Sequence, residues 1–195
     1  MKECSFMKDE SENNHGYEYI LDFQMSWVMR VAASNEMKEN NALLHKYCST
    51  ILKKLIEKSD KDNVEILEVR VWKQWKRIDL HANIIIRING KEEKHLVVIE
   101  NKAYTMIHDD QLNRYEISIN KVYDNDNCLK EFKKHFWVIT FFDPDNDRDN
   151  YKKTEMMCEA SNAKWKLLSF EDLLNDNPLP TGNDQFDDFW IYPWP

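Results

Sequence analysis

The sequence predicts an α/β protein, folded as a three-layer α/β/α sandwich around a central mixed sheet. Two helix-like segments come first, three strand-like segments follow them, and helices and strands then alternate. A chain of 195 residues with 42% hydrophobic residues is long enough to bury one core, so a single domain over residues 1–195 is expected. The alternation in the second half indicates helices on both faces of the sheet.

The N-terminal part, residues 17–58, is predicted to hold two helices. Residues 1–15 are polar and charged, and we expect them to form a flexible arm. Residues 17–33 are almost continuously apolar, which is typical of a well-buried helix. Residues 38–58 carry an apolar stripe at helical spacing, which predicts a second helix. A loop rich in Ser, Asp and Asn ends this helix at residues 59–63.

Three strand-like segments begin the predicted core, which spans residues 64–170. Residues 65–72 alternate between apolar and polar side chains, as a half-buried strand does. Residues 77–88 include three consecutive isoleucines, which indicates burial on both faces. Residues 95–104 form the third predicted strand. Between the last two strands, Asn89-Gly90 is a strong signal for a two-residue hairpin turn.

The rest of the chain alternates between helical and strand patterns and ends in an irregular tail. The tail contains Gly182 and four prolines, which interrupt regular structure. The predicted elements are a helix over 109–123, a strand over 135–142, a helix over 154–163, a strand over 164–169, a helical turn over 170–174 and the irregular tail over 175–195.

Composition and charge exclude several classes of function. The net charge of −8 argues against loose, sequence-blind binding of nucleic acid. The four cysteines lack CxxC spacing, and three glycines leave no phosphate-cradling loop. No apolar run approaches the ~20 residues that cross a bilayer, and the N-terminus lacks a signal-peptide core. We therefore expect a cytoplasmic protein without a membrane partner.

The acidity is unevenly distributed along the chain. Residues 141–195 hold five Lys/Arg against twelve Asp/Glu, whereas residues 64–115 hold nine against eight. The segment with the candidate chemistry is therefore close to neutral.

The most informative stretch is residues 97–102, where an apolar strand ends in Glu100, one spacer residue and Lys102. Alternation along a strand places these two side chains on the same face. The preceding strand delivers a second carboxylate, Asp79, 21 residues before Glu100 (100 − 79). Two carboxylates and a lysine at strand ends can hold a divalent cation and activate a water beside it. This chemistry performs metal-assisted phosphodiester hydrolysis.

Three short motifs give the chain a family resemblance. They are Arg77-Ile78-Asp79-Leu80, Ile99-Glu100-Asn101-Lys102 and Gln111-Leu112-Asn113-Arg114-Tyr115. In this order they resemble the branch of the PD-(D/E)xK nuclease superfamily with the pattern R-I-D-L … I-E-N-K … Q-L-x-x-Y. The resemblance is good over roughly residues 65–142 and implies a restriction-endonuclease-like core. The chain departs from the family at Ile78, where a proline usually precedes the first Asp.

The resemblance also implies roles for individual residues. Asp79 and Glu100 would bind Mg²⁺, which Mn²⁺ could replace, and Lys102 would position or activate the attacking water. The backbone carbonyl of Asn101 would complete the metal shell. Family members often carry a further acidic residue on the first helix, where Glu18 is the best match and Asp22, one turn later, is less suitable.

Several of these residues also have ordinary structural interpretations. Gln111 and Tyr115, four apart, share one helical face and can point back at the strand ends; Tyr115 could equally be part of the core. The segment 70–77 interleaves two tryptophans with four positive residues, which suits nucleic acid or an ordinary hairpin covered by lysine stems. Alternating aromatics in the tail, Trp190, Tyr192 and Trp194, are consistent with an exposed strand or with packing on the same chain.

The sequence therefore predicts a Mg²⁺-dependent endonuclease or exonuclease that hydrolyses phosphodiester bonds in DNA. The alternative is a catalytically silent module with the nuclease fold, which binds or regulates in a defence or DNA-processing system. An RNA-directed nuclease is a third possibility that the sequence does not separate from the first. A homodimer is possible, because double-strand cutting by one small active site favours a pair.

Overall fold

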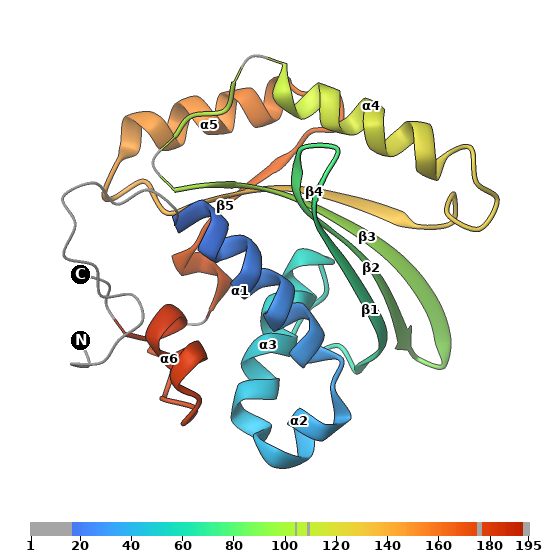
Figure 1. The fold of residues 1–195 in the computed structure, drawn as a ribbon, viewed down its shortest axis with the longest axis vertical. Coiled ribbons are helices and arrows are strands. Elements are labelled where there is room, and N and C mark those ends of the chain that lie inside the picture. Colours follow the sequence, from blue (N-terminus) through green and yellow to red (C-terminus); the bar gives the residue numbers. More distant parts are fainter. Residues whose placement is uncertain (1–16, 104, 109, 175–176, 193–195) are drawn as a thin grey trace.

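The computed structural model describes residues 17–103, 105–108, 110–174 and 177–192, and Figure 1 shows its fold. A five-stranded sheet in the order β1-β2-β3-β4-β5 forms the middle layer. Its first three strands pair antiparallel, and the last two pair parallel to β3 and to each other. The predicted mixed sheet is confirmed. The strands are β1 (Val64–Trp75), β2 (Ile78–Ile88), β3 (Lys91–Lys102), β4 (Lys133–Thr140) and β5 (Lys166–Ser169).

Helices cover both faces of this sheet (Figure 1). One face packs against the N-terminal helices and the last helix, and the opposite face packs against the two helices of the second half. Each interface has its own apolar cluster, so the predicted α/β/α sandwich is confirmed. The helices are α1 (Tyr17–Ala32), α2 (Asn35–Asn40), α3 (Ala42–Leu55), α4 (Gln111–Tyr123), α5 (Arg148–Ala160) and α6 (Asp184–Trp190), with a short 3-10 turn at Glu171–Leu173.

The N-terminal helices differ from the prediction at one point. Helix α1 matches the apolar run, but the single helix expected over 38–58 is divided into α2 and α3. Asn41 leaves the helical conformation with a φ of −148°, and its side chain accepts a hydrogen bond from the Leu44 N–H. Asn41 thus caps the start of α3, although the apolar stripe of the sequence continues without a break. The predicted arm, 1–15, lies outside the described residues.

The β2–β3 hairpin forms at the predicted turn. Asn89 and Gly90 have φ values of 49° and 78°, the left-handed pair that a two-residue turn requires. The pairing of Ile88 with Lys91 continues without a break to the pairing of Leu80 with Ile99. This register carries residue 79 of β2 alongside residue 100 of β3.

Helix α5 begins earlier than expected, at Arg148 rather than at residue 154. The side chain of Asp147 accepts from the Asn150 N–H at 3.3 Å and caps the helix. The acidic loop before it conceals this start, because its Asp and Asn residues also suit a turn.

The predicted irregular tail over 175–195 is wrong, because α6 spans Asp184–Trp190. Asn183 caps this helix, and the buried carboxylate of Asp187 accepts from the backbone N–H groups of Thr181 and Gly182, at 2.9 Å each. Phe186 and Phe189 are buried against the core. Trp190 is also buried, in a helix and not in an exposed strand. The prolines and the glycine before it obscured a short helical spacing of aromatic residues.

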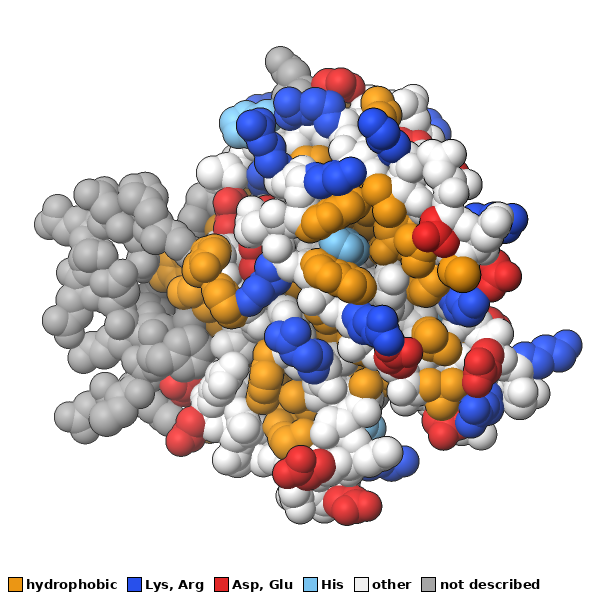
Figure 2. All heavy atoms as spheres, turned by 45° about the vertical axis from the view of Figure 1, so that its right-hand side comes forward, with side chains coloured by type: hydrophobic (Ala, Val, Ile, Leu, Met, Phe, Trp, Pro, Cys, Tyr) orange, Lys and Arg blue, Asp and Glu red, His pale blue; other side chains and the backbone are white. Residues whose placement is uncertain are grey.

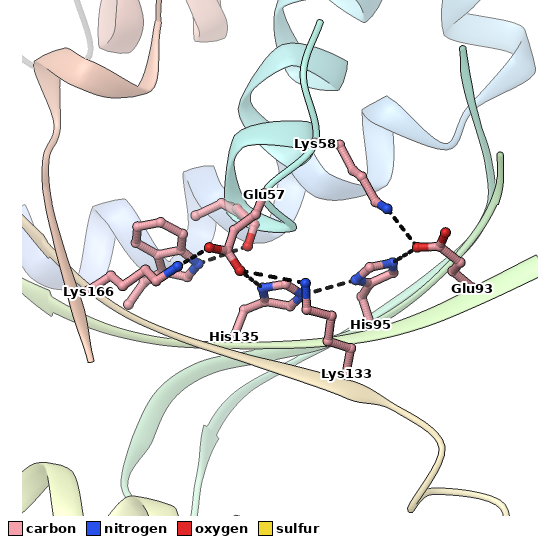
Figure 3. Close-up of polar contacts among 9 residues, drawn as sticks. Glu57, Lys58, Glu93, His95, Lys133, His135 and Lys166 are labelled. Atoms are coloured by element: carbon pink, nitrogen blue, oxygen red, sulfur yellow. Dashed lines mark hydrogen bonds and ion pairs between the residues drawn. The ribbon is translucent and has the colours of Figure 1, made fainter. Parts of the chain in front are cut away.

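A buried pair of histidines joins α3 to the sheet, as Figure 3 shows. The His95 Nδ1 and His135 Nε2 atoms lie 2.9 Å apart. At its outer nitrogen, His135 contacts a carboxylate oxygen of Glu57 at 2.9 Å, and His95 contacts Glu93 at 3.2 Å. Glu57 also pairs with Lys166, and Glu93 pairs with Lys58 at 2.7 Å. We name this group, His95, His135, Glu57, Glu93, Lys58 and Lys166, the imidazole cluster.

The imidazole cluster contains an unusual helix end. Glu57 follows α3 with a left-handed φ of 58°, a position that glycine usually takes after a helix. A side chain there costs conformational energy but reaches the sheet. Burial lowers the pKa of His95 and lowers that of His135 to about 3.

Candidate active site

The C-terminal end of β3 and the start of β2 bring two predicted residues together. The backbone N–H of Asn101 donates to Asp79 Oδ2 at 2.9 Å, which fixes the Asp79 carboxylate beside β3. Glu100 is 1% exposed, whereas Asp79 is half-buried. Solvent therefore reaches the site at Asp79 and not at Glu100.

Lys102 lies next to Glu100, as strand alternation predicts. Its Nζ atom is 2.7 Å from Glu100 Oε1, and both side chains are almost fully buried. The same oxygen accepts a hydrogen bond from Gln111 Nε2 at 2.6 Å. Glu100 Oε1 is thus held by a cation from its own strand and by an amide from α4.

Gln111 and Tyr115 face the strand end from α4. Gln111 Nε2 donates to the Tyr115 hydroxyl at 2.8 Å as well as to Glu100, and both residues are buried. Burial and the nearby Glu100 raise the pKa of Tyr115 to about 12, so its hydroxyl keeps its proton. The structure therefore brings the pair to the predicted site, with Tyr115 also packed in the core.

The electrostatics of Glu100 are those of a buried acid beside another acid. Burial and the charge of Asp79 raise the pKa of Glu100 to about 8, although Lys102 opposes this shift. At neutral pH and without a cation, Glu100 is mostly protonated. Its second oxygen, Oε2, is buried and has no hydrogen-bond partner among the described residues.

A third carboxylate, Asp22, reaches the site from α1. Its Oδ1 accepts from Asn101 Nδ2 at 2.6 Å, and its Oδ2 accepts from Gln74 Nε2 at 2.9 Å. Gln74 Nε2 also lies 3.2 Å from Asp79 Oδ1, so one amide bridges the two acids. Burial and the charge of Asp79 raise the pKa of Asp22 to about 6.

Glu18, the acid that the sequence favoured on α1, contacts the segment that directly follows Lys102. Its Oε1 accepts from the Ala103 N–H at 3.0 Å and from Thr105 Oγ1 at 2.6 Å, which ties it to the segment after β3. Asp22, one helical turn later, is the α1 carboxylate that meets Asn101 and experiences the charge of Asp79. The geometry thus favours Asp22 over Glu18.

The donor set fits a hard divalent cation. Among the described residues, no three His, Cys, Asp or Glu side chains are grouped to hold a metal ion by themselves. Mg²⁺ needs fewer protein ligands, because it keeps several waters and binds through one or two carboxylates. Glu100 Oε2 is buried beside the Asp79 carboxylate, and a cation there would take the place of the proton that Glu100 holds in the metal-free chain.

Two residues of the site were undervalued or missed from the sequence. Asp22 lies among the apolar residues of α1, and a carboxylate in such a run is a signal because a buried charge needs a partner. Gln74 gives no comparable signal. It has a left-handed φ of 54° near the end of β1, and only the folded hairpin shows where its amide lies.

Comparison with known protein families gave one match. The model described as the PD-(D/E)XK nuclease superfamily matches residues 6–176, which is most of the chain. Comparisons with curated proteins and with solved structures gave no match. Within the described residues, no helix has the length and apolar character needed to cross a membrane.

Proposed function

The chain belongs to the PD-(D/E)XK nuclease superfamily, and from this membership we propose that it is a metal-dependent nuclease that hydrolyses phosphodiester bonds in DNA. One observation supports this most strongly. Glu100 is buried beside Asp79 with an unpartnered oxygen and a pKa of about 8, a costly arrangement that a divalent cation would relieve.

Asp79 and Glu100 would hold the cation, together with the backbone carbonyl of Asn101. Asp22 would act from α1, in place of Glu18, by fixing Asn101 and sharing Gln74 with Asp79. When bound, Mg²⁺ or Mn²⁺ would polarise the phosphate and lower the pKa of the water that it holds.

The other residues of the site would stabilise charge beside the reacting groups or hold Glu100 in position. Lys102 contacts Glu100 Oε1 and would place its amino group beside the reacting phosphate or the attacking water. Gln111 holds the same oxygen of Glu100 and is itself braced by the Tyr115 hydroxyl. Gln111 and Tyr115 are therefore positioning residues, because they act through the carboxylate of Glu100.

Cleavage assays with paired variants test the proposal. The wild-type protein should cut DNA with Mg²⁺ or Mn²⁺, and Asp79→Asn and Lys102→Ala should each lose at least about 100-fold in rate. The matched controls Asp149→Asn and Lys152→Ala alter exposed residues of α5 and should retain full rate. Full activity in both site variants would refute the site, and RNA cleavage without DNA cleavage would correct the substrate.

The second candidate is a catalytically silent module of the same fold, which binds or regulates. The closed Lys102–Glu100 pair favours it, because these side chains are only 7% and 2% exposed. This candidate predicts no cleavage of DNA or RNA with either metal.

A homodimer and a cytoplasmic location stay predictions. Light scattering of the purified chain tests whether it forms a homodimer.

A further inference from the structure

The tip of the β1–β2 hairpin carries an aromatic group that the hydrolytic site does not use. Trp72 of β1 and His81 of β2 are paired across the strands, and their rings stack with centroids 4.9 Å apart and an interplanar angle of 7°. Trp75 lies against the same imidazole, with a centroid distance of 4.8 Å. We name Trp72, His81 and Trp75 the hairpin platform.

The hairpin platform is open to solvent at one indole. Trp72 is 40% exposed, whereas His81 between the two indoles is 4% exposed. Figure 2 shows a face of the molecule where hydrophobic side chains gather around a histidine, bordered by Lys and Arg side chains. An exposed indole with cations beside it offers an aromatic face on which a planar ligand can stack.

His81 is arranged to support the indoles. Its Nδ1 atom is buried without a hydrogen-bond partner among the described residues. Leaving a buried nitrogen unpaired costs stability. The ring nevertheless stays between Trp72 and Trp75, which holds the exposed indole parallel to it.

The hairpin is also a local concentration of positive charge. Residues 69–78 contain Arg70, Lys73, Lys76 and Arg77 and no acidic residue, in a chain whose net charge is −8. Lys76 Nζ lies 4.6 Å from the Trp75 ring centroid, and Lys76 and Arg77 at the tip are both exposed. Both have left-handed φ values, 53° and 69°, a conformation that is unfavourable without glycine.

The hairpin platform lies close to the carboxylates. Asp79 and His81 are two residues apart on β2, a separation of about 7 Å along the strand. A second exposed aromatic pair, Tyr19 and Phe23 of α1, lies beside Asp22 in sequence, with Lys73 Nζ 3.1 Å from the Phe23 ring centroid. Aromatic and cationic groups therefore flank the acids on both elements.

We propose that the hairpin platform stacks an unpaired nucleobase, and that the site therefore takes single-stranded nucleic acid or unpaired ends. An indole face stacks on any base whose own face is free, while Lys and Arg beside it contact the backbone phosphates. In a blunt duplex only the outer faces of the two terminal base pairs are free, so an exposed indole has far fewer base faces to stack on than in a single strand. This inference rests on the proposed nuclease function and specifies its substrate.

Anisotropy titrations of the full chain in metal-free buffer test the inference apart from cleavage. The probes are fluorescein-labelled single-stranded DNA, the same sequence as RNA, and the blunt DNA duplex. We expect the single strand to bind more tightly than the duplex, and Trp72→Ala to weaken single-strand binding about tenfold. Trp72→Phe should retain most of the affinity, and the relative affinity of the DNA and RNA strands identifies the natural polymer.

Matched variants separate a specific platform from general effects. Ile117→Ala removes another exposed apolar side chain, on α4, and should bind as the wild type does. The double variant Lys76→Gln/Arg77→Gln should weaken binding and reduce its salt dependence, whereas Lys152→Gln/Lys153→Gln on α5 should not.

The outcomes distinguish this inference from the proposed function. Equal affinity for single strand and duplex, or a Trp72→Ala variant that binds like the wild type, overturns the platform, even if Asp79-dependent cleavage stands. Self-association that Trp72→Ala abolishes also overturns it, because a second copy then occupies the indole. Binding that depends on Trp72 without cleavage of any substrate supports the platform and refutes the nuclease.

Discussion

Strand β3 carries a buried polar cluster toward each end, and the two clusters differ in how completely their polar atoms are paired. In the imidazole cluster, each ring nitrogen of His95 and His135 has a polar neighbour within 3.2 Å, and both flanking carboxylates pair with lysines. At the other end, Glu100 keeps one buried oxygen without a partner among the described residues and lies beside a second acid.

The difference separates a structural cluster from a candidate functional one. Buried polar atoms in proteins are nearly always satisfied, so the imidazole cluster is the ordinary solution and contributes to the junction of α3 with the sheet. Unmet acceptors and like charges cost stability, and they persist where a ligand completes them. The same strand thus ends in a paired polar cluster on one side and in two adjacent acids on the other.

The largest expected effect is on stability at the structural end. His135→Ala should destabilise the chain by about 3 kcal/mol, because it leaves a cavity and deprives Glu57 and His95 of a buried partner. Glu100→Gln should change stability by less than about 1 kcal/mol at pH 7, because the amide resembles the protonated acid. Urea unfolding at pH 7 measures the free energy of unfolding of both variants. Equal losses of stability would contradict the distinction between a structural and a functional end of β3.

The next effect is a fall in the stability of the metal-free chain as the pH rises. Glu100 has a folded pKa of about 8, above its ordinary 4.5, so between these values the folded state holds a proton that the unfolded state has released. Stability then falls with rising pH by up to about 1.4 kcal/mol per unit. Asp22, raised to about 6, adds the same sign at lower pH. Glu100→Gln should flatten this slope above pH 6 in melts recorded at several pH values.

The imidazole cluster should give the opposite slope in acid. Its two imidazoles have lowered folded pKa values, about 3 for His135, so below pH 6.5 the unfolded state binds protons that the folded state does not. Stability therefore falls as the pH falls through this window. His135→Gln should reduce the slope between pH 6.5 and 4, and an unchanged slope would assign the acid sensitivity to other groups.

The smallest expected effect concerns the amide of α4. Gln111→Ala removes the hydrogen bonds to Glu100 Oε1 and to the Tyr115 hydroxyl and should cost about 1 kcal/mol in stability. If Gln111 only positions Glu100, the cleavage rate should fall about tenfold and the metal concentration at half-maximal rate should rise. A loss as deep as that of Asp79→Asn would show a more direct role.

Local patterns in the sequence predicted which side chains come together at the end of β3. Glu100 and Lys102 share a face because strands alternate, and Gln111 and Tyr115 share one because helices repeat every 3.6 residues. Asp79 was found through its motif, and the hairpin register places it beside β3. These features depend on chain geometry over a few residues, which the sequence displays directly.

Features that depend on packing between distant segments could not be predicted from the sequence. Glu18 and Asp22 lie one turn apart on α1, and only the docking of α1 on the sheet decides which one reaches Asn101. His95 and His135 meet because β3 and β4 pair in parallel, 40 residues apart. Helix α6 has only seven residues, too few to show a clear periodicity. A cap and contacts with the core hold it in place.

Calorimetric titration of Mn²⁺ into three variants tests the central claim, that the carboxylate end of β3 is a metal site and the imidazole end is not. The wild type and His135→Gln, each shown to be folded by circular dichroism, should bind Mn²⁺ with similar affinity. Asp79→Asn should bind at least about tenfold more weakly. Undiminished binding in Asp79→Asn, or lost binding in folded His135→Gln, would contradict the account.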